Sequence, residues 1–144
     1  MEPACAAQPR SGLRILVADD NPDTVEMMAL VLRLHGHEVQ TAPDGLTALR
    51  LFQEQKPDVV FLDIGMPHMS GWDVARRVRE LVAPACRPPL LVAITGYGGA
   101  ENEQRSAEAG FDRHLLKPVD IKEIQRLLYK FSALMTAEIN GQAS

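Results

Sequence analysis

Apolar residues along the chain gather into short continuous runs, separated by longer stretches in which apolar residues recur with a helical period. Four runs are rich in Val, Ile or Leu, at residues 14–18, 58–62, 90–94 and 114–116. Runs of this length are typical of parallel strands that are covered on both faces. A fifth run, at 38–42, is weaker, and we predict an edge strand there.

The stretches between these runs carry apolar residues three and four positions apart, which places them on one face of a helix. Five such stretches occur along the chain, and the fourth, at 100–109, has few apolar residues on that face. The stripes of the other four predicted helices are Val25, Met28, Ala29, Leu32; Gly45, Ala48, Leu49, Phe52; Val74, Val78, Leu81; and Ile121, Ile124, Leu128, Phe131.

Capping residues agree with these helices. Asn21 and Pro22 supply an N-cap followed by proline at the first helical position, and Gly36 is suited to close that helix. Asp120 and Glu123 resemble a capping box before the last helix. Strand and helix therefore alternate five times, which predicts an α/β open sheet with helices on both faces.

The chain of 144 residues, 46% of them hydrophobic, suits one domain with a single sizeable core. We predict that this domain spans residues 13–135. The polar or small-residue ends, 1–12 and 136–144, are predicted to be disordered arms.

Charge and cysteine content exclude several classes of protein. The net charge is -4, so we expect binding neither to nucleic acid nor to an anionic membrane surface. Cys5 and Cys86 lie far apart, which indicates neither a zinc site nor a disulfide scaffold. No apolar stretch resembles a signal peptide or a membrane span, and we expect a cytoplasmic protein.

Polar residues follow four of the predicted strands. Asp19 and Asp20 come directly after the first, Asp63 after the third, Thr95 after the fourth and Lys117 after the fifth. Because ligands of open α/β sheets bind outside the carboxyl ends of the strands, we expect these side chains to converge. Each pair of carboxylates about 4 Å apart would repel by roughly 4 kcal/mol. A cation is therefore expected among them.

Mg²⁺ suits this set because it takes one or two carboxylates and completes its shell with water and phosphate oxygens. Asp63 could then act as a nucleophile on phosphorus and form an acyl phosphate. The Gly65 carbonyl is a further expected metal ligand, Thr95 a donor to a phosphoryl oxygen, and Gly96 a source of space beside it.

Four motifs in order resemble the receiver domain of two-component response regulators: VADDN at 17–21, FLDIGMPHMSG at 61–71, ITGYG at 94–98 and LKP at 116–118. The likeness runs from about residue 13 to 134 and is greatest to receivers attached to hybrid histidine kinases. It implies a flavodoxin-like (βα)5 fold whose parallel strands have the order 2-1-3-4-5.

The resemblance also implies roles for single residues. Asp63 is the phosphoacceptor and, with Asp20 and the Gly65 carbonyl, binds Mg²⁺; Asp19 acts through metal-bound water. Thr95 and Lys117 sense the phosphate, and the Lys117-Pro118 bond is expected to be cis. The implied phosphoryl donor is a sensor histidine kinase or a histidine phosphotransfer protein.

Phosphorylation is expected to pull Thr95 and the loop at 96–99 toward the site. This would change the surface of the fourth helix, fifth strand and fifth helix, where we expect a downstream protein to bind. Receivers of this type often have an aromatic residue three positions before the lysine, whereas this chain has His114. That aromatic signalling step is therefore not carried over unchanged.

Other interpretations remain open at this point. Asp19 and Asp20 could cap the first helix, and Lys117 could be a solvated cation. Arg76, Arg77 and Arg79 are expected on a solvated helix face, with partner docking as the other possibility.

Three rival functions involve other classes of protein. An interaction module with a receiver fold would need no phosphorylation. A phosphatase of the haloacid dehalogenase type usually needs a second acid where this chain has Gly65. A nucleotide site at 96–98 lacks the third glycine, because Glu101 stands there.

Overall fold

The computed structural model describes residues 12–82, 87–96 and 100–141, with the side chains of 100, 101 and 135–141 left out. Within these residues five strands alternate with five helices. In chain order they are β1 (Arg14–Ala18), α1 (Pro22–Leu34), β2 (Glu38–Ala42), α2 (Gly45–Gln55), β3 (Val59–Asp63), α3 (Gly71–Leu81), β4 (Leu90–Thr95), α4 (Ala100–Ala109), β5 (Arg113–Leu116) and α5 (Ile121–Gly141).

Some sequence predictions fall outside the described residues. They concern the N-terminal arm at 1–11, the last residues at 142–144, both cysteines, and the middle of the loop at 96–99. Among the described residues, no helix is long and apolar enough to cross a membrane.

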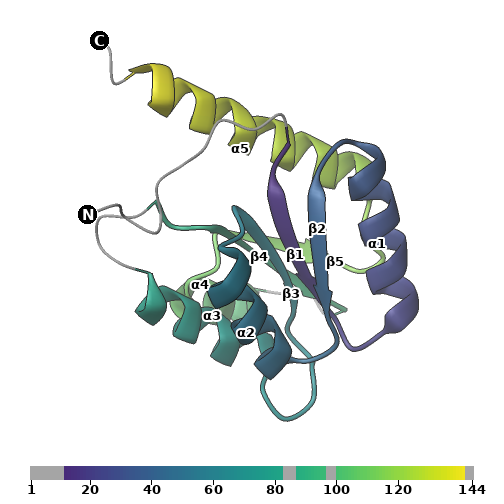
Figure 1. Cartoon of the computed structure of the whole chain (residues 1–144). Helices are drawn as coiled ribbons and strands as arrows, with labels where there is room; N and C mark the ends of the chain where they lie inside the picture. Colours follow the sequence, from purple (N-terminus) through teal and green to yellow (C-terminus); the bar gives the residue numbers. More distant parts are fainter. Residues whose placement is uncertain (1–11, 83–86, 97–99, 142–144) are drawn as a thin grey trace.

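The strands form one parallel sheet in the order β2-β1-β3-β4-β5, as predicted. β2 lies at the edge, also as predicted. Figure 1 shows α1 on one side of the sheet and α2, α3 and α4 on the other. This arrangement confirms an open α/β sheet with helices on both faces.

Two apolar layers cover the sheet because successive side chains of a strand point to opposite faces. In β1, Ile15 and Val17 pack into a cluster with residues of α1 and α5. Leu16 and Ala18 pack into the other cluster, with residues of α2, α3 and α4. The central strand β3 is buried along its whole length, which explains its uninterrupted apolar sequence.

The predicted capping residues lie at the helix ends. The Asn21 side chain accepts hydrogen bonds from the first turn of α1, and Gly36 follows that helix with a φ of 90°. Asp120 Oδ1 accepts from the backbone N of Lys122 at 2.9 Å, which makes Asp120 the cap of α5.

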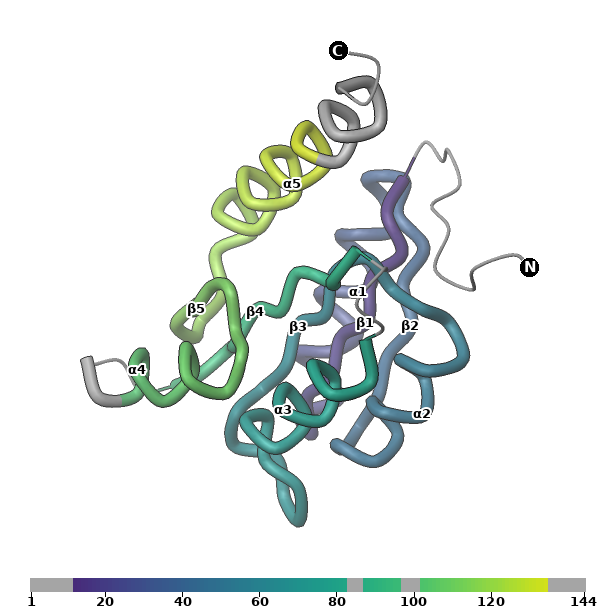
Figure 2. The backbone as a smooth tube through the Cα atoms, turned by 90° about the vertical axis from the view of Figure 1, so that its left-hand side faces the viewer, coloured from purple at the N-terminus to yellow at the C-terminus, as the bar shows by residue number. Residues whose placement is uncertain are grey.

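Two elements near the C-terminus differ from the predictions. β5 lies at the second edge of the sheet, and Leu116 is 51% exposed, so this strand is not covered on both faces. α5 continues to Gly141, so residues 136–141 are helical where we predicted a disordered tail from 136. This stretch contains no proline, so it extends the hydrogen-bond ladder of a helix that the residues before it have already nucleated. In both views α5 extends away from the sheet (Figures 1 and 2).

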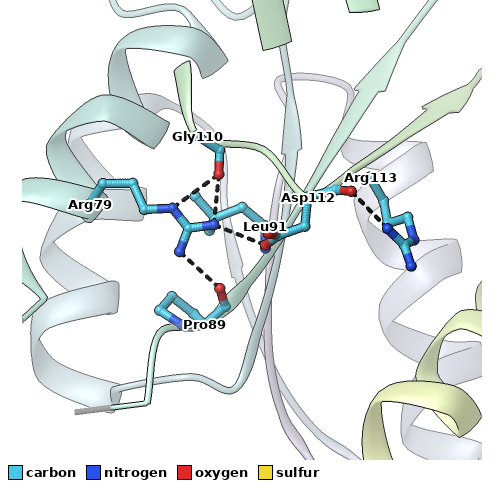
Figure 3. Close-up of polar contacts among 6 residues, drawn as sticks. All are labelled: Arg79, Pro89, Leu91, Gly110, Asp112 and Arg113. Atoms are coloured by element: carbon cyan, nitrogen blue, oxygen red, sulfur yellow. Dashed lines mark hydrogen bonds and ion pairs between the residues drawn. The ribbon is translucent and has the colours of Figure 1, made fainter. Parts of the chain in front are cut away.

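Arg79 of α3 ties together the segments that lead into β4 and β5 (Figure 3). Its Nε and Nη2 atoms donate to the Gly110 carbonyl at 3.0 and 2.6 Å, and Nη1 donates to the Pro89 carbonyl at 3.1 Å. Nη2 also pairs with Asp112 Oδ2 at 2.9 Å. The same carboxylate oxygen accepts from the backbone N of Leu91 at 2.9 Å. One guanidinium thus satisfies three acceptors from distant parts of the chain.

The prediction of a solvated face is therefore wrong for Arg79. Arg76 and Arg77 do lie on an exposed face, in ion pairs with Asp73 and Glu80. Arg79 differs because its position on the helix faces α4 and β5 rather than water. The three arginines have the same local sequence character, and only the tertiary neighbours separate them.

Candidate functional site

Three carboxylates lie together at the carboxyl edge of the sheet. β1 and β3 are neighbours, with Ala18 beside Leu62, so Asp19 and Asp63 come side by side. Asp20 is the next residue, and carboxylate oxygens of the three aspartates lie within 4.8 Å of one another. Asp19 and Asp63 are buried, whereas Asp20 is exposed. The structure therefore brings together the acids that the strand ends predicted to converge.

Lys117 places its ammonium between two of these carboxylates. Its Nζ atom lies 3.2 Å from Asp19 Oδ2 and 3.2 Å from Asp63 Oδ2. The backbone N of Lys117 donates to the Thr95 carbonyl at 2.8 Å, which continues the pairing of β4 with β5. The Lys117-Pro118 peptide bond is cis, as the resemblance predicted. Lys117 is thus a partner of the acids rather than a solvated cation.

Burial and the neighbouring charges shift the pKa values of Asp19 and Lys117. Burial raises the pKa of Asp19, and the negative charge of Asp63 raises it further. A hydrogen bond from the backbone of Asn21 and the charge of Lys117 lower it, but the net effect is a raised pKa for Asp19. Burial lowers the pKa of Lys117, but the two carboxylates outweigh it and the net pKa is raised. Lys117 therefore stays protonated at neutral pH, and its positive charge faces Asp19 and Asp63.

Asp19 has one oxygen that is not used by the helix behind it. Its Oδ1 atom accepts from the backbone N of Asn21 at 2.9 Å, and Asn21 itself caps α1. Its Oδ2 atom is buried and makes the ion pair with Lys117, but it receives no hydrogen bond of good geometry from the residues that the structure describes. The interpretation of Asp19 as the helix cap is therefore wrong, because Asn21 has that role. A buried acceptor in this condition suits a cation ligand.

The loop after Asp63 is held tightly against the sheet. The backbone N of Gly65 donates to Asp63 Oδ1 at 3.0 Å, and Ile64 N donates to Ile94 O at 3.0 Å. A Cβ atom on Gly71 would lie 2.7 Å from the Asp63 carbonyl oxygen. Gly71 is therefore required for the close approach of α3 to the end of β3, a role that the sequence motif alone did not reveal.

Thr95 and Gly96 lie at the end of the neighbouring strand. β4 pairs with β3, with Ile94 beside Asp63, and Thr95 is buried. A Cβ atom on Gly96 would meet no atom within 4 Å, so open space lies there. These positions fit the predicted donor to a phosphoryl oxygen and the predicted space beside it.

Two further residues that we expect to take part in the switch lie before and after Lys117: His114, at the usual aromatic position, and Pro118, in the cis bond. His114 is half-buried on β5, and its Nε2 atom is buried with no hydrogen-bond partner within the described part of the chain. It lines a cavity of about 310 Å³ between β5 and α5, together with Leu127 and Phe131. Pro118 is exposed. The imidazole thus points its unpaired nitrogen into the interior rather than toward solvent.

The site contains the donor set of a hard divalent cation. Asp19, Asp20 and Asp63 offer three clustered carboxylate oxygens, two of them from buried residues. Oxygen donors of this charge are the ligands that Mg²⁺ prefers, and the cluster is open to water through Asp20. The residues present therefore fit a magnesium ion.

Comparison with known proteins follows the same motifs. Residues 15–129 match the family described as the response regulator receiver domain. An uncharacterised 14.6 kDa protein from the sodA1 3' region of Leptolyngbya boryana is 37% identical over 81% of this chain and 88% of its own length. The sensor histidine kinase RcsC of Escherichia coli is 33% identical over 85% of this chain but only 12% of its own length. Two further relatives match over about half of their length.

Solved structures show the same fold. The chemotaxis protein CheY4 of Vibrio cholerae superposes with a TM-score of 0.77 and 26% identity, over 84% of this chain and 99% of that one. The match to RcsC agrees with the expected likeness to receivers of histidine kinases.

Proposed function

The chain belongs to the response regulator receiver family, and from that membership we propose that Asp63 accepts a phosphoryl group from a sensor histidine kinase or a histidine phosphotransfer protein. The observation that carries this proposal is the contact of Lys117 Nζ with Asp63 Oδ2 at 3.2 Å, inside a cluster of three carboxylates. The protein acts as a regulatory phosphoacceptor in the cytoplasm rather than as an enzyme with turnover.

The transfer forms one bond and breaks one. An oxygen of the Asp63 carboxylate attacks phosphorus, and the N–P bond of the donor phosphohistidine breaks. Its electron pair returns to the imidazole nitrogen, which takes up a proton. Asp63 Oδ1 is oriented by the Gly65 N–H at 3.0 Å, which leaves Oδ2 toward Lys117.

Asp19, Asp20, Asp63 and the Gly65 carbonyl would hold the magnesium ion. Bound Mg²⁺ supplies positive charge that offsets the charge on the transferring phosphoryl oxygens. Lys117 contributes a second positive charge from the protein. Thr95, buried at the end of β4, supplies a hydroxyl donor to a phosphoryl oxygen.

Phosphorylation adds a charge of about -1.5 to -2 and three strong acceptor oxygens at Asp63. The Lys117 ammonium, which now contacts Asp19 and Asp63, would then engage the phosphoryl group. Because the Lys117 backbone is hydrogen-bonded to Thr95, the two residues move together. We propose that this change reaches the surface of α4, β5 and α5, where a downstream protein binds, with a coupling of about 1–3 kcal/mol.

His114 and Pro118 connect Lys117 to that surface. His114 lies three residues before Lys117 on β5, and its buried Nε2 atom, which has no partner among the described residues, lies toward the cavity under α5. Any shift of Lys117 moves β5 and therefore this imidazole. His114 takes the place of an aromatic residue in transmitting the change.

The experiment is uptake of the phosphoryl group from acetyl phosphate, read by intact-mass spectrometry with and without Mg²⁺. We expect one added phosphoryl group, only with the metal, and loss of the adduct in Asp63→Asn. Asp23→Asn, which removes an exposed acid of α1, is the matched control and should react like the parent protein. An unreactive parent protein would instead support an interaction module with this fold. Continuous phosphate release from a small phosphomonoester would indicate a phosphatase.

A further inference from the structure

A second polar surface lies between α1 and α5, and it carries the opposite charge to the aspartate cluster. It is a groove of about 730 Å³ that is lined on the α5 side by Lys122, Arg126 and Lys130. The C-terminal end of α1 contributes His35, and the segment before β2 contributes His37. None of the described residues that line this groove carries a carboxylate.

The three cations form one stripe along α5. They recur every four residues, which places neighbouring side chains about 6 Å apart on one face of the helix. All three are exposed, and none forms an ion pair within the described ranges of the chain. Three cations in a row stand out in a protein whose net charge is -4, with Glu123, which lines the β5–α5 cavity beside Arg126 and Lys130, as the carboxylate next to them.

The walls of the groove are fixed in place by hydrogen bonds. His35 Nε2 lies 2.8 Å from Gln125 Nε2, and His35 Nδ1 lies 2.9 Å from the Val31 carbonyl oxygen. With the imidazole proton on Nδ1, His35 donates to Val31 and accepts from Gln125. His37 Nδ1 accepts from the backbone N of Leu13 at 3.1 Å. The His35 bonds join the end of α1 to α5, and the His37 bond joins the segments before β1 and β2, so the groove is formed before any partner binds.

Apolar side chains accompany the charges. Tyr129 lines the groove and is 77% exposed, and Leu32 and Leu128 form its base from the core side. A surface that combines a cationic stripe with apolar contacts fits an acidic segment that also carries large apolar residues. A flat anionic membrane would reach the stripe but would leave the base of the groove unfilled.

From these observations we propose that the groove between α1 and α5 binds an acidic, amphipathic segment of a partner protein. A partner helix with acidic residues four positions apart would match the spacing of Lys122, Arg126 and Lys130 and would place apolar residues against Tyr129. α1 is 13 residues long. His35 therefore lies about 20 Å along the helix from the aspartates.

The α1–α5 groove shares Arg126 and Lys130 with the cavity between β5 and α5, whereas Lys122, Tyr129 and His35 line the groove and not that cavity. The inference does not rest on phosphorylation of Asp63. Asp63→Asn should bind the same segment with unchanged affinity.

The test uses fluorescence anisotropy with a labelled 15-residue peptide of Glu and Leu, in which Glu recurs every four residues. A peptide with Gln in place of Glu is the neutral probe. We expect the acidic peptide to bind, and its affinity to fall as the salt concentration rises. Its affinity for Lys122→Glu/Lys130→Glu should be lower than for the parent protein by about tenfold or more. The milder Lys122→Gln/Lys130→Gln should weaken binding less, and Tyr129→Ser should weaken it without changing the salt dependence.

Arg50→Glu/Lys56→Glu is the matched control, because it makes the same change in net charge at two exposed cations of α2 and its end. It should bind the acidic peptide within about twofold of the parent protein. Circular dichroism melting verifies that each variant is folded. The inference is overturned if the parent protein does not bind the acidic peptide or if the neutral peptide binds as tightly. It is also overturned if Arg50→Glu/Lys56→Glu loses as much binding as Lys122→Glu/Lys130→Glu. Binding to phosphatidylserine vesicles in place of the peptide would assign the groove to a membrane surface instead.

Discussion

The Nζ atom of Lys117 lies 3.2 Å from Oδ2 of Asp63, and the two residues are separated by 54 positions in the sequence. The same ammonium lies 3.2 Å from Oδ2 of Asp19. One partly exposed cation therefore offsets the charge of two buried carboxylates. Any group added to Asp63 must change this contact, and this links the chemistry at Asp63 to the end of β5.

Replacing Lys117 by methionine should destabilise the protein by about 1–3 kcal/mol in EDTA, because two buried carboxylates lose their cation. Mg²⁺ should reduce this loss, since it supplies positive charge to the same oxygens. Urea unfolding with EDTA and with Mg²⁺ measures both values. Lys130→Met is the control and should change the free energy of unfolding by less than about 0.5 kcal/mol. Equal losses in EDTA and in Mg²⁺ would show that Lys117 and the metal act at different places.

Mg²⁺ should raise the melting temperature of the parent protein, because a ligand that binds the folded state stabilises it. The gain is about 2.7 kcal/mol when the free metal is at one hundred times its Kd. Asp20→Asn should lose most of this shift, since Asp20 offers an exposed carboxylate beside two buried ones. Asp23→Asn removes an exposed acid only three residues away and should keep the shift. A thermal melt over a Mg²⁺ series measures the effect, and identical shifts in both variants would remove Asp20 from the metal site.

The raised pKa of Asp19 predicts a pH dependence of stability. A carboxyl with a folded-state pKa above its usual 3.8 contributes stability that is present below that value. This contribution is lost as the pH rises through the folded-state pKa, because the charged form is buried beside Asp63. Asp19→Asn should therefore gain stability relative to the parent protein as the pH rises from about 3.5 to 7 in EDTA. Unfolding free energies of the two proteins across this range check the sign. A difference that is constant with pH, or that reverses, contradicts it.

Arg79→Met should destabilise the protein by about 2–3 kcal/mol, because the carbonyls of Gly110 and Pro89 and the carboxylate of Asp112 lose a charged donor. The free energy of unfolding of Arg79→Lys should lie between those of the parent protein and Arg79→Met, since a single ammonium lacks the fork geometry with which a guanidinium reaches three acceptors. Arg76→Met breaks an exposed pair on the same helix and should cost less than about 1 kcal/mol. Urea unfolding of the three variants measures this order, and equal losses at 76 and 79 would contradict it.

Much of the fold follows from local pattern. The continuous apolar run of β3 is typical of a strand that is buried on both faces. The apolar residues three and four positions apart in α1 are typical of a helix that is buried on one face. The site was equally predictable from the sequence: Asp19 and Lys117 follow a strand, Asp63 ends one, and the carboxyl ends of parallel strands meet at one edge. Sequence order alone therefore predicted which residues would converge.

The tertiary structure decided which side chains became partners. Arg79 has the same local character as Arg76, yet it binds carbonyls that reach it only when α3, β4 and β5 are packed together. Gly71 has to be a glycine because α3 approaches the Asp63 backbone, a contact that no local period encodes. The groove between α1 and α5 likewise joins residues about 90 positions apart. The sequence by itself determined the elements and the edge at which the acids meet, because hydrogen bonding and burial act locally. The pairing of Lys117 with two acids, the role of Arg79 and the charged groove depend on distances between elements, and only packing sets those distances.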